Sequence, residues 1–120
     1  MNPILLVTGG SRGIGAATAR LAAARGWDVA INYTRDAAAA EAVALDVRAQ
    51  GRRAITLQAD VADEAQVLAM FAAVDAQFGR LDALVNNAGV VDVTSRVEDM
   101  NLARLKRMFD INILGSFLCA

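Results

Sequence analysis

The sequence contains Thr8-Gly9-Gly10-Ser11-Arg12-Gly13-Ile14-Gly15 between a short apolar run and a stretch with the apolar spacing of a helix. Glycines allow a backbone to turn sharply and to approach a phosphate, because no Cβ stands in the way. The start of the following helix offers free N–H donors and the positive end of the helix dipole. The segment therefore predicts a strand, a glycine-rich turn and a helix that bind a diphosphate.

Two other interpretations of the glycine segment are open. A tight strand-to-helix turn without a ligand also uses glycines, but the strand–helix repeats around this segment make that alternative weaker. A nucleoside-triphosphate P-loop is disfavoured because Ala16 and Ala17 follow Gly15, where that loop needs lysine and then serine or threonine.

Apolar runs recur along the chain at regular distances. They begin near Ile4, Val29, Ala54 and Leu81, and stretches with helical apolar spacing lie between them. The run at residues 4–7 does not alternate with polar residues, which is typical of a parallel strand covered by helices on both faces. We therefore expect an α/β fold, a Rossmann-type doubly wound parallel sheet in one NAD(P)-binding domain over residues 1–120.

Local signals mark the ends of the expected helices. Asp36 is suited to cap the second helix, and Asp63 with Gln66 makes a capping-box-like start for the third. Asn101 is the expected cap of a fourth helix, which follows a last strand at residues 81–85. The first three helices are each expected to end at a glycine, namely Gly26, Gly51 and Gly79.

Each helix is expected to carry its apolar residues on one side. The first has Ile14, Thr18 and Leu21, the second Ala40, Val43, Ala44 and Val47, and the third Val67, Phe71, Val74 and Phe78. The last helix contains the apolar run 111–120, which has no glycine or proline terminator and no polar tail. A domain seldom ends in this way, so we expect the sheet to be truncated after its fourth strand and following helix.

Composition excludes several classes of function. The formal net charge is −1 and the isoelectric point is near 5.3, so no basic field attracts nucleic acid or an anionic membrane. The chain has one cysteine, Cys119, and no histidine, so no internal disulfide and no usual zinc site is expected. No stretch approaches the length of an apolar membrane helix or a signal-peptide core, so we expect a cytoplasmic protein.

The end of the second strand decides between the two nicotinamide dinucleotides. An acidic residue there would bond the ribose 2′-hydroxyl of NAD and repel the 2′-phosphate of NADP. Tyr33 stands at that position, and Arg35 with Arg12 could bind the 2′-phosphate, although both are also explained as solvated surface charges. Asp36 has the spacing of an NAD-type acid, but a helix cap is its simpler role. NADP is therefore favoured over NAD.

Four motifs in this order resemble the short-chain dehydrogenase/reductase family. They are TGGSRGIG at residues 8–15, Asp60-Val61 after the third strand, NNAG at residues 86–89 after the fourth, and Asn112 in the last helix. The resemblance covers essentially all 120 residues and is greatest to bacterial 3-oxoacyl-carrier-protein reductases and glucose 1-dehydrogenases. Members of this family often pair through the helix that begins near Asn101 and the helix after it, so the resemblance also implies a homo-oligomer for the full-length protein.

The resemblance implies a role for each motif. Asn112 matches the catalytic asparagine of the family, which helps to hold a water in a proton relay. The resemblance implies that Ser11, Arg12 and Ile14 line the pyrophosphate and adenosine side, that Asp60 and Val61 contact the adenine, and that Asn86, Ala88 and Gly89 border the cofactor ribose. The expected cofactor-binding residues are these together with Gly9, Gly13 and Gly15 of the glycine turn and Tyr33 and Arg35 of the strand tip. As alternatives, Asp60 could simply end a strand, and the amides of Asn86 and Asn87 could tie adjacent strand ends together.

The catalytic tyrosine, lysine and serine of this family find no match in the sequence. Its only tyrosine, Tyr33, has alanine four residues later, and its only lysine, Lys106, is followed by Arg107. Without a tuned proton donor, a positioned hydride alone is a poor catalyst. The leading hypothesis is therefore the cofactor-binding part of an NADP-dependent oxidoreductase for a small carbonyl or alcohol substrate. A non-catalytic dinucleotide-binding or redox-sensing module and an inactive truncated product are the alternatives.

Overall fold

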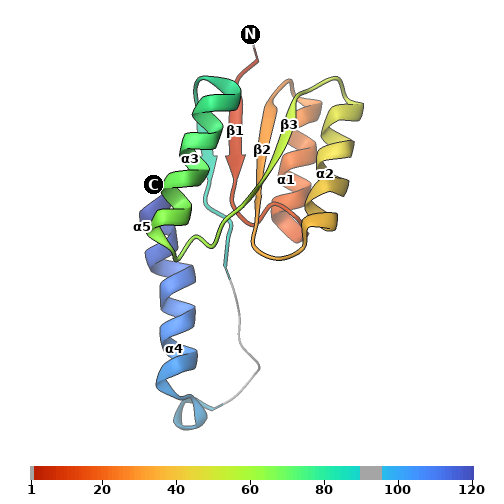
Figure 1. The fold of residues 1–120 in the computed structure, drawn as a ribbon. Coiled ribbons are helices and arrows are strands. Elements are labelled where there is room, and N and C mark those ends of the chain that lie inside the picture. The colour runs from red at the N-terminus through yellow and green to blue at the C-terminus, as the bar shows by residue number, and fades with distance from the viewer. Residues whose placement is uncertain (1, 90–95) are drawn as a thin grey trace.

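The computed structural model describes residues 2–89 and 96–120 and has four parallel strands in the order β3-β2-β1-β4 (Figure 1). Each strand leads through a helix to the next, as the repeating apolar pattern predicts. The strands are β1 (Ile4–Val7), β2 (Asp28–Tyr33), β3 (Ala54–Gln58) and β4 (Ala83–Val85). The helices are α1 (Gly13–Ala24), α2 (Ala37–Ala49), α3 (Glu64–Phe78), η1 (Val97–Asp99), α4 (Leu102–Phe109), η2 (Asp110–Leu114) and α5 (Gly115–Cys119).

Helices cover both faces of the sheet, so the predicted doubly wound α/β fold is confirmed. One apolar cluster joins α1 and α2 to Leu5 and Val29, and a second joins α3 and α5 to Leu6 and Ala30 on the other face. The carboxyl ends of the strands lie at the lower edge of the sheet in Figure 1, where α4 extends away from it. Among the described residues, no helix combines the length and apolarity needed to span a membrane.

The cap predictions for three helices are confirmed. Asp36 accepts a hydrogen bond from the N–H of Ala39, and Asn101 accepts one from Arg104. Asp63 accepts from the N–H of Gln66, but the side chain of Gln66 does not close a capping box. Its amide group donates to the Asp63 carboxylate and accepts from the N–H of Asp60 instead, so it also fixes the end of the loop after β3.

The apolar side predicted for α1 is wrong. Ile14 and Leu21 are 78% and 55% exposed, and small residues face the sheet: Gly15, Ala16, Ala19 and Ala23. Small side chains let the helix approach the sheet closely, and spacing rules that favour bulky residues miss such a face. The stripe predicted for α2 is buried as expected. In α3, Val67, Met70 and Val74 are buried, whereas Phe71 and Phe78 are partly buried.

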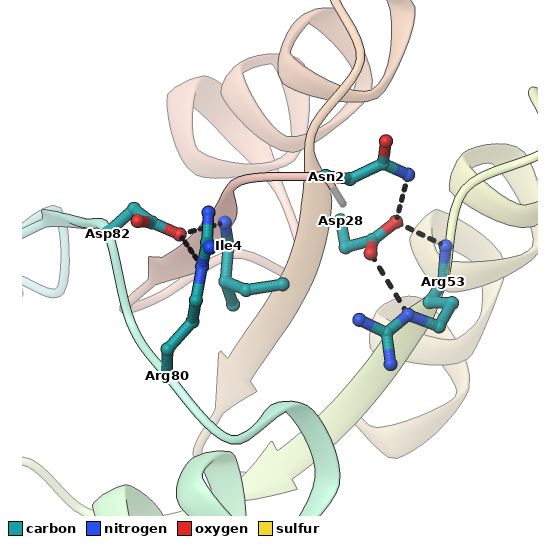
Figure 2. A network of polar contacts seen from close by, with 6 residues as sticks. All are labelled: Asn2, Ile4, Asp28, Arg53, Arg80 and Asp82. Carbon is teal, nitrogen blue, oxygen red and sulfur yellow. Dashed lines mark hydrogen bonds and ion pairs between the residues drawn. The ribbon is translucent and has the colours of Figure 1, made fainter.

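The fourth strand is shorter than predicted, because residues 81 and 82 precede the ladder with β1. The carboxylate of Asp82 accepts the N–H of Ile4 at 2.7 Å and the Nε of Arg80 at 2.9 Å (Figure 2). A strand that begins a ladder often leaves its first N–H groups unpaired, and here a side chain supplies the acceptor. Asp82 therefore fastens β4 to the start of β1 although it lies outside the strand.

A second carboxylate fastens the start of β3 to β2. Asp28 is buried and accepts the N–H of Arg53 at 2.8 Å, the Nε of Arg53 at 3.0 Å and the amide of Asn2 at 3.2 Å (Figure 2). Burial raises the pKa of Asp28, but these donors outweigh it and hold the pKa below its ordinary value of 3.8. The N–H of Ile4 and the guanidinium of Arg80 likewise lower the pKa of Asp82.

We expect the chain to lose stability in acid through these two carboxylates. Because their folded pKa values lie below the ordinary 3.8, their stabilisation is complete above that value and is lost as the pH falls through the folded pKa values. Urea midpoints measured from about pH 5 downward should fall with pH. The decline should be shallower in Asp82→Asn and in Asp28→Asn. A wild-type slope in both variants would contradict this prediction.

Candidate functional site

A cleft of about 520 Å³ lies where the carboxyl ends of the strands meet the glycine turn. Ligands of open parallel sheets bind at this edge, next to the point where the strand order reverses. The cleft is lined by these residues of the predicted set: Gly9, Ser11, Arg12, Ile14, Tyr33, Arg35, Asp60, Val61, Ala88 and Gly89. It is also lined by residues that the prediction did not include, namely Thr34, Asp36, Asn87, Arg107 and Ile111.

The N-terminus of α1 is open toward this cleft. Its N-cap, Arg12, is extended and makes no side-chain cap, whereas side chains cap α2, α3 and α4. Within the described residues, no acceptor is found for the N–H groups of Gly13, Ile14 and Gly15. Gly13 has φ +58°, and a Cβ built on it would meet nothing within 4 Å. These unpaired N–H groups lie at the positive end of the helix dipole, where an anion in the cleft would be stabilised.

Gly15 lies beneath the turn and acts through close packing. A Cβ on it would overlap the carbonyl oxygen of Gly9 and lie 2.6 Å from Nδ2 of Asn87 and 3.0 Å from Cα of Gly10. The first turn of α1 can therefore rest on residues 9 and 10 only because this position has no side chain. The prediction placed Gly13 and Gly15 among the binding residues, and neither lines the cleft.

Positively and negatively charged side chains lie together where the cleft meets the end of β2. The guanidinium of Arg12 lies 3.5 Å from the carboxylate of Asp36 and is 76% exposed on its side chain. Asp36 also caps α2, so its simpler predicted role is confirmed. Arg35 is exposed at the cleft, and no carboxylate pairs with it among the described residues. Arg107 of α4 also lines the cleft and adds a third cation.

Asn87 ties the glycine turn to the end of β4. Its side-chain amide donates to the carbonyl oxygens of Thr8 at 3.2 Å and Gly9 at 3.0 Å. The hydroxyl of Thr8 accepts the N–H groups of Asn87 and Ala88 in return. The alternative in which an amide joins adjacent strand ends is therefore confirmed for Asn87.

Asn86 and Asn112 lie beside the cleft and do not line it. The amide of Asn86 donates to the carbonyl oxygen of Ser116 at 3.0 Å and so holds α5 against the end of β4. Asn112 lies in η2, a π-helical segment between α4 and α5, and its Oδ1 would be 3.3 Å from a Cβ on Gly89. Segments of π-helix often occur at functional sites, because the extra residue redirects side chains.

The position of η2 depends on a close contact between Gly115 and Val61. A Cβ on Gly115 would lie 2.6 Å from Cγ2 and 3.1 Å from the carbonyl oxygen of Val61. Gly115 lies three residues after Asn112, and Val61 directly follows Asp60. The contact therefore packs this helical segment against the loop that contains Asp60. Cys119 at the end of α5 is then buried in the second apolar cluster, and burial raises the pKa of its thiol.

We expect Gly115→Ala to expose the thiol of Cys119. One overpacked methyl group costs about 1–3 kcal/mol, which corresponds to a roughly 5- to 150-fold faster reaction of a thiol that reacts only when α5 opens. The measurement is the rate at which a thiol reagent modifies Cys119 under native conditions. Ser116→Ala adds no atom to this contact and should keep the wild-type rate. Equal rates in the wild type and Gly115→Ala would show that α5 does not depend on this contact.

A second cleft of about 390 Å³ lies at the opposite edge of the sheet. Three arginines line it, and each has a partner in the fold. Arg48 pairs with Glu41, Arg53 pairs with Asp28, and Nε of Arg52 donates to the C-terminal part of α1. Arg53 also lies over the ring of Phe78, 4.8 Å from its centroid. These side chains hold α1, α2 and α3 to the start of β3.

In a comparison with protein families, residues 3–120 match the model described as short chain dehydrogenase. Among individual proteins, 97% of the chain is 48% identical to an uncharacterized oxidoreductase of Escherichia coli, YgfF, and covers 47% of it. The chain is 42% identical to a 3-oxoacyl-[acyl-carrier-protein] reductase of Synechocystis, with 97% and 47% of the two chains covered. It spans about half the length of these relatives.

Solved structures share the fold over the same extent. A short chain dehydrogenase from Burkholderia cenocepacia in complex with NADP is 44% identical and superposes with a TM-score of 0.93. A short-chain dehydrogenase/reductase variant from Serratia marcescens is 39% identical, with a TM-score of 0.92. Both comparisons cover 98% of this chain and 47% of the other.

Proposed function

Because the chain belongs to the short-chain dehydrogenase/reductase family of oxidoreductases, we propose that its cleft binds NADP and that it forms the cofactor-binding part of a carbonyl reductase or alcohol dehydrogenase. The observation that carries the proposal is the uncapped N-terminus of α1 at a cleft whose lining includes Arg12, Arg35 and Arg107. Such an end offers donors that suit the pyrophosphate of a dinucleotide.

The residues around the cleft fit each part of NADP. The N–H groups of Gly13, Ile14 and Gly15 would take the pyrophosphate, with Ser11 beside them. Asp60 and Val61 would contact the adenine, and Ala88 and Gly89 would border the nicotinamide ribose. The amide of Asn86 donates to the carbonyl oxygen of Ser116, so Asn86 would affect the ribose indirectly, by fixing the position of the loop after β4.

The strand tip favours NADP over NAD. Tyr33 stands where an acid would bond the ribose 2′-hydroxyl, so the 2′-phosphate would meet no opposing charge from the strand itself. Arg12 and Arg35 would bind this phosphate by charge-assisted hydrogen bonds. In the free chain Asp36 neutralises Arg12 at 3.5 Å, a weak exposed pair that the phosphate would compete with.

When NADP is bound, its nicotinamide supplies or accepts the hydride of the reaction. Asn112 lies against Gly89, and we assign to its amide the task of holding a water for proton transfer. The chain contains no Tyr-x-x-x-Lys segment, so we propose that the proton donor and the substrate-binding residues are not among these 120 residues. A module that binds the dinucleotide without catalysis is the second candidate, and the same absence favours it.

Binding and turnover of NADPH by the purified chain test this proposal together. We expect saturable binding of NADPH, and no decrease in reduced nicotinamide absorbance when small aldehydes and ketones are added. Carbonyl-dependent oxidation of NADPH by the chain alone would contradict the placement of the proton donor. Absence of NADPH binding would contradict both candidate functions.

We further propose a cytoplasmic homo-oligomer. The apolar side chains exposed on the last helical segments support pairing between copies, and they include Leu102, Phe109, Leu114 and Phe117. Association through α4, η2 and α5 together would bury these side chains.

A further inference from the structure

Asn32 is a polar residue in the middle of the sheet. It lies on β2, between β1 and β3, and only 1% of it is exposed. A buried amide costs free energy unless its donors and acceptor are paired, and all the polar atoms of this side chain have partners. These partners lie in the glycine turn and at the end of β3.

On one side, Asn32 holds the glycine turn. Its Oδ1 accepts the N–H of Gly9 at 3.1 Å, and its backbone carbonyl oxygen accepts the N–H of Gly10 at 2.8 Å. Gly9 has φ +61°, so the chain reverses direction at this point. Two consecutive N–H groups of the turn are thereby bonded to β2, which leaves the N–H groups of the residues after Gly10 for a ligand.

On the other side, Asn32 holds the end of β3. Its Nδ2 donates to the carbonyl oxygens of Leu57 at 3.2 Å and Ala59 at 3.1 Å. Ala59 directly precedes Asp60 and Val61, which line the opposite wall of the cleft. One amide group therefore joins the wall that would take the pyrophosphate to the wall that would take the adenine.

We propose that Asn32 is a positioning residue for dinucleotide binding, which fixes the glycine turn and the end of β3 at the separation that the ligand requires. This inference rests on the proposed function of the cleft. An amide is required because the turn side needs an acceptor and the β3 side needs two donated hydrogens. A carboxylate lacks the donors, and an aliphatic side chain lacks both.

The first test measures amide hydrogen exchange in the glycine turn without any ligand. In the wild type, amide exchange measured by NMR should show protection of both Gly9 and Gly10. In Asn32→Leu and in the milder Asn32→Ser, the N–H of Gly9 should exchange about tenfold faster or more, since its acceptor is lost. Gly10 is the internal control, because its acceptor is a backbone oxygen that every substitution keeps. An unprotected Gly9 in the wild type would overturn the proposal, whichever variants fold.

The second test measures the dissociation constant for NADPH by calorimetry. Both Asn32 substitutions should raise the dissociation constant of the folded chain for NADPH about tenfold or more. This loss of affinity should exceed the loss in a variant that is equally destabilised elsewhere. Val43→Ala in α2 is this control, because Val43 is buried away from both walls. Wild-type affinity in a folded Asn32 variant would overturn the proposal. A wild type that binds no NADPH would instead overturn the proposed function and leave the exchange result to decide how Asn32 acts on the turn.

Discussion

Gly15→Ala should weaken NADPH binding about a hundredfold or more and lower the free energy of unfolding by about 2–3 kcal/mol. The added methyl group would overlap the Gly9 carbonyl oxygen and crowd the amide of Asn87. Both neighbours are held by other contacts, so α1 must move away from the turn. The N–H groups that would take the pyrophosphate move with it.

The sign of the change in unfolding free energy distinguishes a closely packed glycine from an ordinary helical one. In an ordinary helical position, alanine stabilises a helix by about 1 kcal/mol relative to glycine. Unfolding in urea measures the stability of the variant, and calorimetry with NADPH measures its affinity. Gly51→Ala is the matched control: Gly51 has φ +77°, and its Cβ would meet nothing within 4 Å. It should lower stability through backbone strain and keep the affinity of the wild type. A Gly15→Ala chain that is more stable and binds NADPH normally would contradict the packing described for α1.

Tyr33→Asp should reverse the cofactor preference. A carboxylate at the end of β2 would bond the ribose 2′-hydroxyl of NADH and repel the 2′-phosphate of NADPH. Like charges brought face to face at a binding site cost several kcal/mol, so NADPH affinity should fall about a hundredfold or more. Affinity for NADH should rise, because the new carboxylate replaces no existing contact with its hydroxyl.

Tyr33→Asn separates charge from packing in this experiment. Tyr33 packs against the first apolar cluster, and both substitutions remove that contact equally. Asparagine has the size of aspartate without its charge, so this variant should keep a preference for NADPH. Dissociation constants for both dinucleotides in the two variants give the comparison. The same NADPH-to-NADH ratio in Tyr33→Asp and Tyr33→Asn would contradict the role given to the strand tip.

Features of the fold that depend on neighbouring residues could be predicted from the sequence. The caps Asp36, Asp63 and Asn101 were predictable because an N-cap bonds a backbone N–H only three residues away. The α2 stripe was predictable because its residues repeat with the helical period. The cleft lies where the predicted parallel sheet puts it, since parallel strands bring the loops after β1, β2, β3 and β4 to one edge.

Features that depend on distant contacts were not predictable. Which side of α1 is buried depends on how closely Gly15 and Ala19 approach the sheet, and spacing alone pointed to Ile14 and Leu21. Arg107 reaches the cleft from α4 and Ile111 from η2, and only their separation of four residues indicates a shared side. Asn32 gave no signal, because its partners are 23 to 27 residues away.

The measurement that tests the central claim most directly is a calorimetric titration of the purified chain with NADPH and, separately, with NADH at moderate salt. The claim is that the open end of α1 and the arginines at the strand tip form an NADP site. It predicts saturable binding of one NADPH per chain, with a dissociation constant about tenfold or more below that for NADH. Tighter binding of NADH, or no saturable binding of either dinucleotide, would contradict it.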